Sequence, residues 1–121
     1  QARLPLYYAP ADIVTMPSHY ESFGMAALEG LACGRPVVAT SAGGPAYIVE
    51  DHVSGLLAPP NEPAALAARL ERLLLDDQER AFMGEAAQQR AQRFGWDSIA
   101  CDILNIYRDV LRRSSSRARI A

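Results

Sequence analysis

A strand, a helix and a second strand within residues 13–40 constrain the fold of this chain more than any other segment. Ile13 to Met16 form a strand-like run that Pro17 ends. Strong helix formers occupy the segment Met25 to Cys33, and Gly34 is a suitable residue to end the helix. The apolar run Val37 to Thr40 is typical of a strand buried on both faces of a parallel sheet. The segment therefore predicts a βαβ unit with a right-handed crossover.

The remaining sequence predicts one further strand and several helices. We expect a helical turn at 4–9, a short helix at 46–49, a strand at 56–58 and three helices, the first starting at Pro63, the second spanning 78–94 and the third capped by Asp97. Apolar residues repeat with helical spacing in all three: Leu66, Leu70, Leu73 and Leu74 in the first, either Phe82 with Ala86 or Met83 with Ala87 and Phe94 in the second, and Ile99, Ile103, Ile106 and Val110 in the third.

Three parallel strands would leave both sheet edges open if they formed a complete domain. The chain has 121 residues and does not begin with methionine, and this length is at the small end for an α/β fold with helices on both faces of the sheet. We therefore predict the C-terminal half of a doubly wound, Rossmann-like parallel-sheet domain. Residues 1–113 would form this partial domain and residues 114–121 a flexible polar tail.

The composition is that of a globular protein: half of the residues are apolar, and the net charge is −2. We expect no nucleic-acid partner. We also expect a cytoplasmic location, because no apolar segment approaches the ~20 residues of a membrane span. All twelve cationic residues are arginine, so a lysine ammonium would have to come from outside the chain. Cys33 and Cys101 lie in helical patterns without metal-ligand spacing, and both are predicted to be buried reduced thiols.

Two loops should form a ligand site at the carboxyl ends of the strands, where open parallel sheets bind ligands. The first contains Glu21 and leads to Phe23, Gly24 and Met25, whose backbone amides open a helix and favour an anionic oxygen. The second contains the pair Gly43–Gly44. Taken alone, Glu21 could equally serve only as a partner of the helix dipole, and the glycine pair could mark only a turn.

Glu29 is a further candidate because its helical neighbours are apolar. Met25, Ala26, Ala32 and Cys33 lie three and four positions away. An unpaired carboxylate there would cost several kcal/mol, so we expect a polar partner. Hydroxyl groups are natural partners, since a carboxylate can accept a forked pair of hydrogen bonds from a vicinal diol. Without this context, a mid-helix glutamate usually belongs to a solvated face.

The run PSHYESFGMAALEGLACGRPVVAT (17–40), followed by GG and VEDHVSGLLAPP, closely resembles the C-terminal donor-binding domain of family-four (group 1), retaining GT-B glycosyltransferases. The resemblance covers nearly the whole chain, through RFGWDSIA at 93–100. It is specific because two glutamates with seven residues between them, FG after the first and ACGxPVVA after the second coincide in order and spacing.

The resemblance implies transfer of a hexosyl group from a nucleoside diphosphate sugar, such as a UDP- or GDP-hexose, to an acceptor. It implies that Glu21 contacts the donor hexose at the reacting end, that Glu29 binds the ribose hydroxyls, and that Phe23, Gly24 and Met25 lie near the sugar and the distal phosphate. No metal or cofactor is implied, and the chain has no DxD pair. The diphosphate-binding arginine and lysine and the acceptor domain are expected to lie outside this chain, which alone should be inactive.

The sequence departs from the family pattern after the glycine pair. Ala46 and Tyr47 stand where relatives often have glutamate, and Asp51–His52 stand where the next turn often reads DG. We interpret His19 and His52 as surface or loop residues. Two alternatives remain open: another GT-B sugar-nucleotide enzyme, such as an epimerase or a phosphorylase, and a non-catalytic α/β fragment that self-associates through its open sheet edge.

Overall fold

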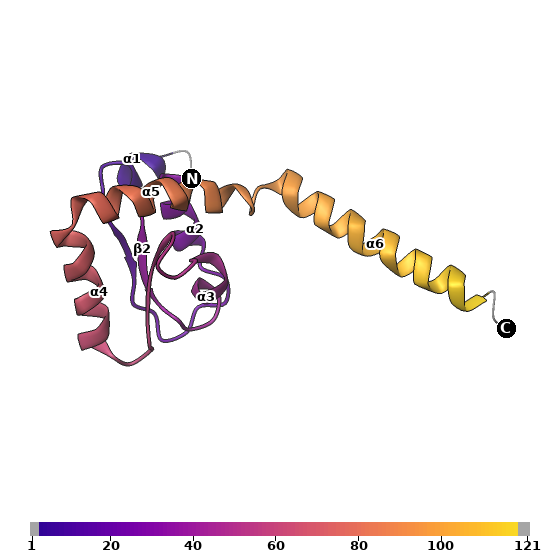
Figure 1. Ribbon diagram of the computed structural model, residues 1–121, viewed down its shortest axis with the longest axis horizontal. Coiled ribbons are helices and arrows are strands. Elements are labelled where there is room, and N and C mark those ends of the chain that lie inside the picture. The colour runs from indigo at the N-terminus through magenta and orange to yellow at the C-terminus, as the bar shows by residue number, and fades with distance from the viewer. Residues whose placement is uncertain (1–2, 119–121) are drawn as a thin grey trace.

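The computed structural model describes residues 3–118, with side chains to 113. Its three strands form one parallel sheet, which lies among the helices in Figure 1. The strands β1 (Val14–Met16), β2 (Val37–Thr40) and β3 (Gly55–Ala58) lie side by side in sequence order. Val14 is paired with Val37, and Val37 with Gly55. The predicted α/β class and the parallel βαβ unit are thus confirmed.

Helices connect and follow the strands. They are α1 (Pro5–Tyr8), α2 (Met25–Ala32), α3 (Pro45–Ile48), α4 (Pro63–Leu75), α5 (Asp77–Gln92) and α6 (Trp96–Ala118). Asp76 caps α5, because its side chain accepts a hydrogen bond of 2.8 Å from the Glu79 amide. Among the described residues, no helix is both long and apolar enough to cross a membrane.

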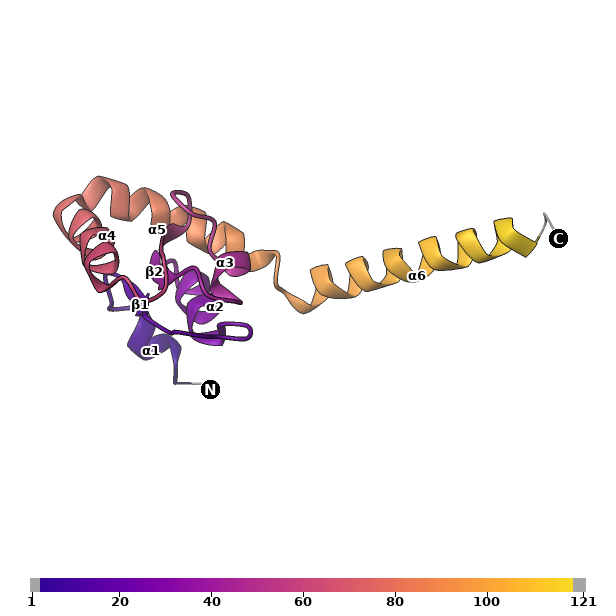
Figure 2. The same ribbon diagram turned by 90° about the horizontal axis from the view of Figure 1, so that it is seen from below.

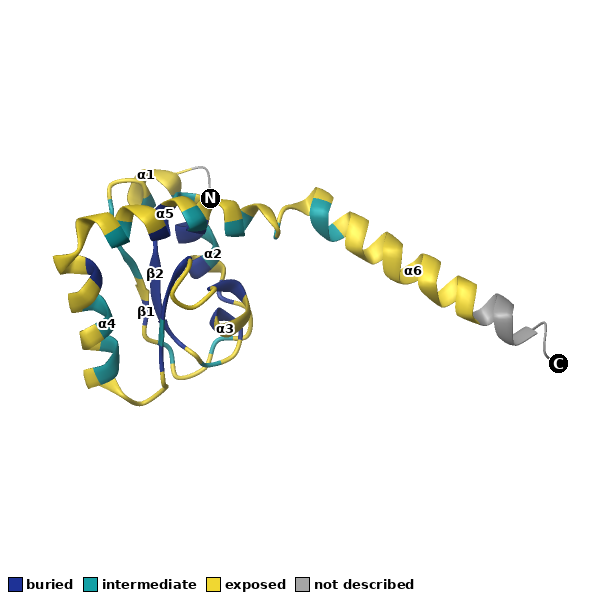
Figure 3. Ribbon diagram, viewed as in Figure 1, coloured by how far each residue is buried: buried dark blue, intermediate teal, exposed yellow. Residues whose placement is uncertain are grey.

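The sheet has a hydrophobic cluster on each face because successive residues of β2 point to opposite sides. Val37 and Ala39 belong to one cluster with residues of α2 and α3, whereas Val38 belongs to the other with Leu73 of α4. All four residues of β2 are buried, which Figure 3 shows in dark blue. This is the burial that the apolar run at 37–40 predicts.

Helix α5 lies across the amino-terminal edge of the sheet. Its Gly84 packs directly on the turn between α2 and β2, where an added Cβ would be 2.6 Å from the carbonyl oxygen of Gly34. Met83 belongs to the cluster of Val38 and Ala87 to that of Val37, so α5 contributes to both cores. The sequence allowed two alternatives for the buried face of this helix. In the structure, Met83 and Ala87 are buried, while Phe82 is exposed. The two candidate loops lie at the opposite, carboxyl edge of the sheet.

The two outer edges of the sheet differ. The Val14 amide donates to the Pro36 carbonyl, so the backbone groups of the exposed Thr15 point away from β2. On β3, three outward backbone groups have partners within the chain: the Gly55 carbonyl accepts from the His52 amide, and the Leu57 amide donates to Asp51 at 2.8 Å. The Leu57 carbonyl accepts from Arg69 at 3.4 Å, and Asp51 forms a parallel bridge with Gly55. Within residues 3–118, the β1 edge is therefore the one more open to another strand.

Helix α6 extends away from the rest of the molecule in both views (Figures 1 and 2). Its apolar stripe is therefore exposed rather than packed on the sheet, with Ile106 61% and Val110 58% accessible.

Cys101 lies on this helix and is exposed, which corrects the prediction of a buried thiol; Cys33 is half-buried, and both thiols are free. Of the predicted tail, residues 119–121 lie outside the described residues.

Candidate functional site

The loops after β1 and β2 meet at the carboxyl edge of the sheet. The Gly44 amide donates a hydrogen bond of 2.7 Å to the Glu21 carbonyl. The approach leaves no room for side chains: an added Cβ would be 2.2 Å from the Glu21 oxygen at Gly43 and 1.9 Å from the Phe23 oxygen at Gly44. The glycine pair is therefore required by a close backbone contact, and the two loops form one surface, as the parallel sheet predicts.

The Glu21 carboxylate binds two backbone amides of its own loop, just before α2. Its Oε1 accepts hydrogen bonds from the amides of Phe23 at 3.3 Å and Gly24 at 3.2 Å. These are two of the amides that the sequence offers to an external anion. In this structure they hold a carboxylate of the chain itself, which is the helix-dipole role considered for this residue.

Gly24 sets the direction in which the chain enters α2. Its φ of 98° lies in the left-handed region that side chains disfavour. It is also enclosed, since an added Cβ would lie 3.2 Å from the Met16 side chain and 3.5 Å from that of Ile48. Met25, the first helical residue, has an exposed side chain. The loop bearing Glu21 is thus fixed against both β1 and α3.

An aromatic contact joins the Glu21 loop to the end of α5. The rings of Phe23 and Phe94 meet edge to face, with centroids 6.4 Å apart. The Arg90 guanidinium lies 5.3 Å from the Phe94 centroid. It also donates to the carbonyls of Ile48 at 3.0 Å and Tyr47 at 2.6 Å, which are the last carbonyls of α3. Arg90 thus connects α5 to the helix that follows the glycine pair.

Replacing Arg90 with alanine should lower the free energy of unfolding by about 1–2 kcal/mol, because two helix-terminal carbonyls lose a charged donor. Urea denaturation followed by circular dichroism would measure the change. Arg93→Ala is the matched control, since Arg93 is exposed near the end of the same helix. Equal stability of the two variants would contradict a role for Arg90 in holding α3.

Glu29 lies in the second turn of α2 and is half-buried. Its Oε2 accepts a hydrogen bond of 3.1 Å from the Tyr8 hydroxyl of α1. The apolar surroundings predicted a polar partner, and the structure supplies one from within the chain. Sequence reasoning did not identify Tyr8, because no periodic pattern connects α1 to α2. The residues around this pair enclose a cavity of about 290 Å³, lined by Leu4, Pro5, Tyr8, Met25, Glu29, Ala32 and Cys33.

The pKa of Tyr8 is raised above its ordinary value. Burial is the main cause, followed by the hydrogen bond to Glu29 and the negative charge of that carboxylate. Because the shift is upward, the hydroxyl stays protonated at neutral pH and remains a donor to Glu29. This contribution to stability is present below the unfolded-state pKa of about 10 and is lost as the pH rises through the folded-state pKa.

Glu21 and Glu29 are separate: Glu21 lies in the loop before α2, and Glu29 lies on α2. Glu29 lies five residues after Gly24, which corresponds to roughly 7.5 Å of helix rise. Glu21 precedes this helix and binds the amide of Gly24, the residue just before it.

Neither histidine lies with these carboxylates. His19 is exposed beside a cavity of about 280 Å³, whose lining also includes Thr40, Asn61 and Glu62. His52 is exposed in the turn before β3, with its Nε2 3.6 Å from Asp51 and its Nδ1 3.4 Å from Arg72.

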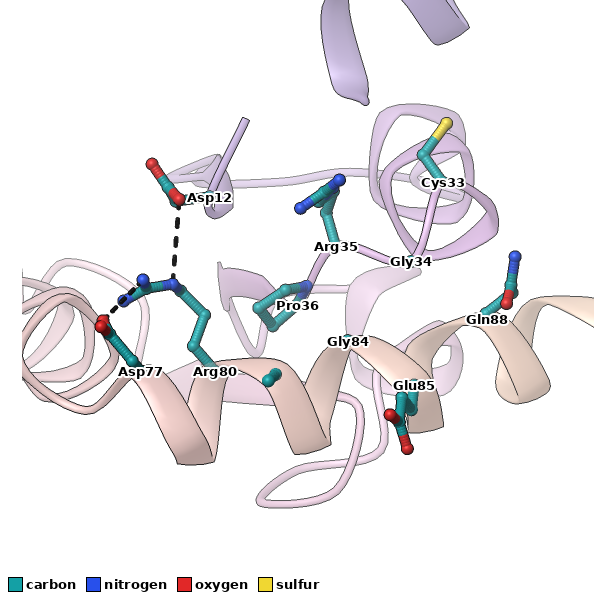
Figure 4. A pocket seen from close by; sticks show the side chains of 11 residues that line it. Asp12, Cys33, Gly34, Arg35, Pro36, Asp77, Arg80, Gly84, Glu85 and Gln88 are labelled. Atoms are coloured by element: carbon teal, nitrogen blue, oxygen red, sulfur yellow. Dashed lines mark hydrogen bonds and ion pairs between the residues drawn. The ribbon is translucent and has the colours of Figure 1, made fainter. Parts of the chain in front are cut away.

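Another cavity lies at the opposite, amino-terminal edge (Figure 4). It has a volume of about 450 Å³ between α5 and the turn before β2. Arg80 lies at one end, 2.7 Å from Asp77 and 3.9 Å from Asp12. Arg35, in the turn before β2, also lines the cavity, and its Nε is buried without a hydrogen-bond partner. Sequence reasoning did not single out these residues, and the candidate loops are at the other edge.

The parallel sheet, with paired loops at its carboxyl edge, places the chain in the Rossmann-like α/β class. Its fold matches solved GT-B glycosyltransferases. Sucrose-phosphate synthase of Thermosynechococcus elongatus is 37% identical, with a TM-score of 0.77 over 89% of this chain and 27% of that protein. HepE of Anabaena, solved with UDP and glucose, is 36% identical, with a TM-score of 0.78 over 88% of this chain and 30% of that protein.

Residues 1–90 match the family described as glycosyl transferases group 1, and the chain belongs to this family. The D-inositol 3-phosphate glycosyltransferase of Salinispora tropica is 44% identical over 94% of this chain, but only 24% of that relative is covered. The corresponding protein of Acidothermus cellulolyticus is 45% identical, over 98% of this chain and 27% of the relative. The chain thus spans about a quarter of the length of these relatives.

A solved C-terminal domain locates the match further. The chain is similar to the C-terminal domain of a group 1 glycosyl transferase from Francisella tularensis, with 32% identity and a TM-score of 0.66. The match covers 71% of this chain and 44% of that domain.

Proposed function

We propose that this chain is the C-terminal part of the donor-binding domain of a retaining glycosyltransferase. The complete enzyme would transfer a hexosyl group from a nucleoside diphosphate sugar to an acceptor. The observation that supports this most is that Glu21 lies in the loop that leads into α2, where the glycine pair closes against it, while Glu29 lies on α2 itself. HepE, which is similar in fold, was solved with UDP-glucose.

In this proposal, Glu29 binds the ribose hydroxyls and Glu21 contacts the donor hexose next to the reacting bond. The remaining lone pairs of each carboxylate can accept hydrogen bonds from sugar hydroxyl groups. Phe23, Gly24 and Met25 lie beside the sugar and the distal phosphate, and Gly43 and Gly44 hold the loop against them. The donor is a substrate, and no metal or cofactor is proposed.

Other parts of the enzyme would supply the cations for the diphosphate and the acceptor site. The chain has no lysine, and Arg35 and Arg80 line the cavity at the opposite edge. The preceding half of the domain would add to the open edge of β1, and the acceptor domain would cover the exposed stripe of α6. D-inositol 3-phosphate, the molecule in the relatives' names, is the first acceptor to test.

Calorimetric titration of the complete enzyme with UDP, GDP and ADP tests the proposal. We expect binding of at least one nucleotide, with micromolar to millimolar affinity typical of a substrate site. Binding of none would favour the alternative of a structural, self-associating fragment. Product analysis with labelled donor would then separate transfer from epimerisation and from phosphorolysis.

A further inference from the structure

The structure gives Glu29 one polar partner whose role the proposed function leaves unassigned. Tyr8 comes from α1, a four-residue helix that precedes β1, and its hydroxyl donates to Glu29 Oε2 at 3.1 Å. We infer that Tyr8 is a positioning residue, which holds the Glu29 carboxylate in the orientation that receives the two ribose hydroxyls. This inference rests on the proposed function and deepens it.

The surroundings of Glu29 explain why a positioning group is needed. A glutamate side chain has three rotatable bonds, and the neighbouring Met25 and Ala32 offer apolar contacts that do not fix its oxygens. The Tyr8 ring is half-buried against α2, so its hydroxyl has a defined place. Because the pKa of Tyr8 is raised, the hydroxyl remains a donor wherever the enzyme would work.

The contact leaves the carboxylate able to bind a diol. A carboxylate has about four lone-pair positions, and Tyr8 uses one of those on Oε2. The remaining positions on Oε1 and Oε2 can accept the 2′ and 3′ hydroxyls together. A carboxylate already held in place loses less conformational entropy when ribose binds, which strengthens binding without adding a ligand contact.

The test compares Tyr8→Phe with Tyr7→Phe in the complete enzyme. Tyr7 is the adjacent residue of α1 and is 75% accessible, so its substitution makes the same chemical change without touching Glu29. The ligands are UDP and its 2′,3′-dideoxy analogue, or the corresponding GDP pair if the titration selects guanine. We expect Tyr8→Phe to weaken binding of the ribonucleotide about tenfold and that of the dideoxy analogue less than twofold, while Tyr7→Phe changes neither.

The dideoxy analogue distinguishes positioning from general destabilisation. If Tyr8→Phe weakens both ligands equally, or neither, the inference is wrong. If the wild-type enzyme binds UDP and the dideoxy analogue equally well, the ribose assignment of Glu29 fails instead. A Glu29→Ala background provides an independent readout, because it leaves Tyr8 no side-chain acceptor at position 29 and adding Tyr8→Phe to it should cause no further loss of nucleotide affinity. A further tenfold loss there would overturn the coupling between the two residues.

Discussion

Replacing Gly44 with alanine is expected to destabilise the folded chain strongly. The new Cβ would lie 1.9 Å from the Phe23 carbonyl oxygen and 2.2 Å from its carbon. Both atoms are backbone, so no side chain can rotate away. Separating the loops would also break the bond from the Gly44 amide to the Glu21 carbonyl. We expect a loss of roughly 4 kcal/mol or more, a large part of the ~5–15 kcal/mol that stabilises a typical domain.

Thermal and urea unfolding followed by circular dichroism would measure this loss. Ser41→Ala is the control, because Ser41 is an exposed residue of the same loop. Its substitution should change stability by less than about 0.5 kcal/mol. Wild-type stability in Gly44→Ala would show that the two loops do not need to touch.

Glu29→Gln in the complete enzyme is expected to lower kcat/KM for the donor by roughly 100-fold. Glutamine keeps the shape and can still accept from Tyr8, but it lacks the charge and one of the two acceptor oxygens for ribose. Since the ribose does not react, its contacts are the same in the bound substrate and the transition state, and the effect should be mainly a higher KM. Initial rates over a range of donor concentrations separate the two parameters.

Glu29 is a more specific probe of the donor site than Glu21. The Glu21 carboxylate also accepts hydrogen bonds from the amides of Phe23 and Gly24 in its own loop, so its removal would reduce both stability and transfer. Glu71→Gln, on the exposed face of α4, is the control for charge removal. If Glu29→Gln and Glu71→Gln had the same kcat/KM as the wild type, Glu29 would not bind the donor.

The elements of the fold follow from sequence because each has a local cause. The apolar run Val37 to Thr40 can only be a buried strand, and the helix 25–32 ends before a glycine. The buried face of α5 could not be chosen from periodicity alone. This helix crosses the amino-terminal edge of the sheet, so Met83 packs on one face and Ala87 on the other. Such a crossing is a tertiary feature that no local pattern encodes.

The candidate site was predictable in its location but not in its contacts. Parallel strands bring the Glu21 loop and the glycine pair to one edge, which required only the order of elements. That Glu21 binds amides of its own loop depends on how the chain turns at Gly24, whose φ is 98°. The Tyr8–Glu29 bond depends on how α1 packs on α2, and the exposed stripe of α6 depends on what lies beyond this chain.

The unequal edges of the sheet limit how this chain can assemble. On β3, the outward carbonyls of Gly55 and Leu57 and the Leu57 amide are already bonded to His52, Arg69 and Asp51. Within residues 3–118, a further strand can therefore join most readily at β1, and two copies that pair there would leave no comparably open edge for a third. Strand pairing of the separated chain should stop at a dimer instead of growing into fibres. If the chain is part of a larger sheet, as we propose, the same asymmetry would let a second polypeptide add its strands in a single orientation, as in an enzyme reconstituted from two pieces.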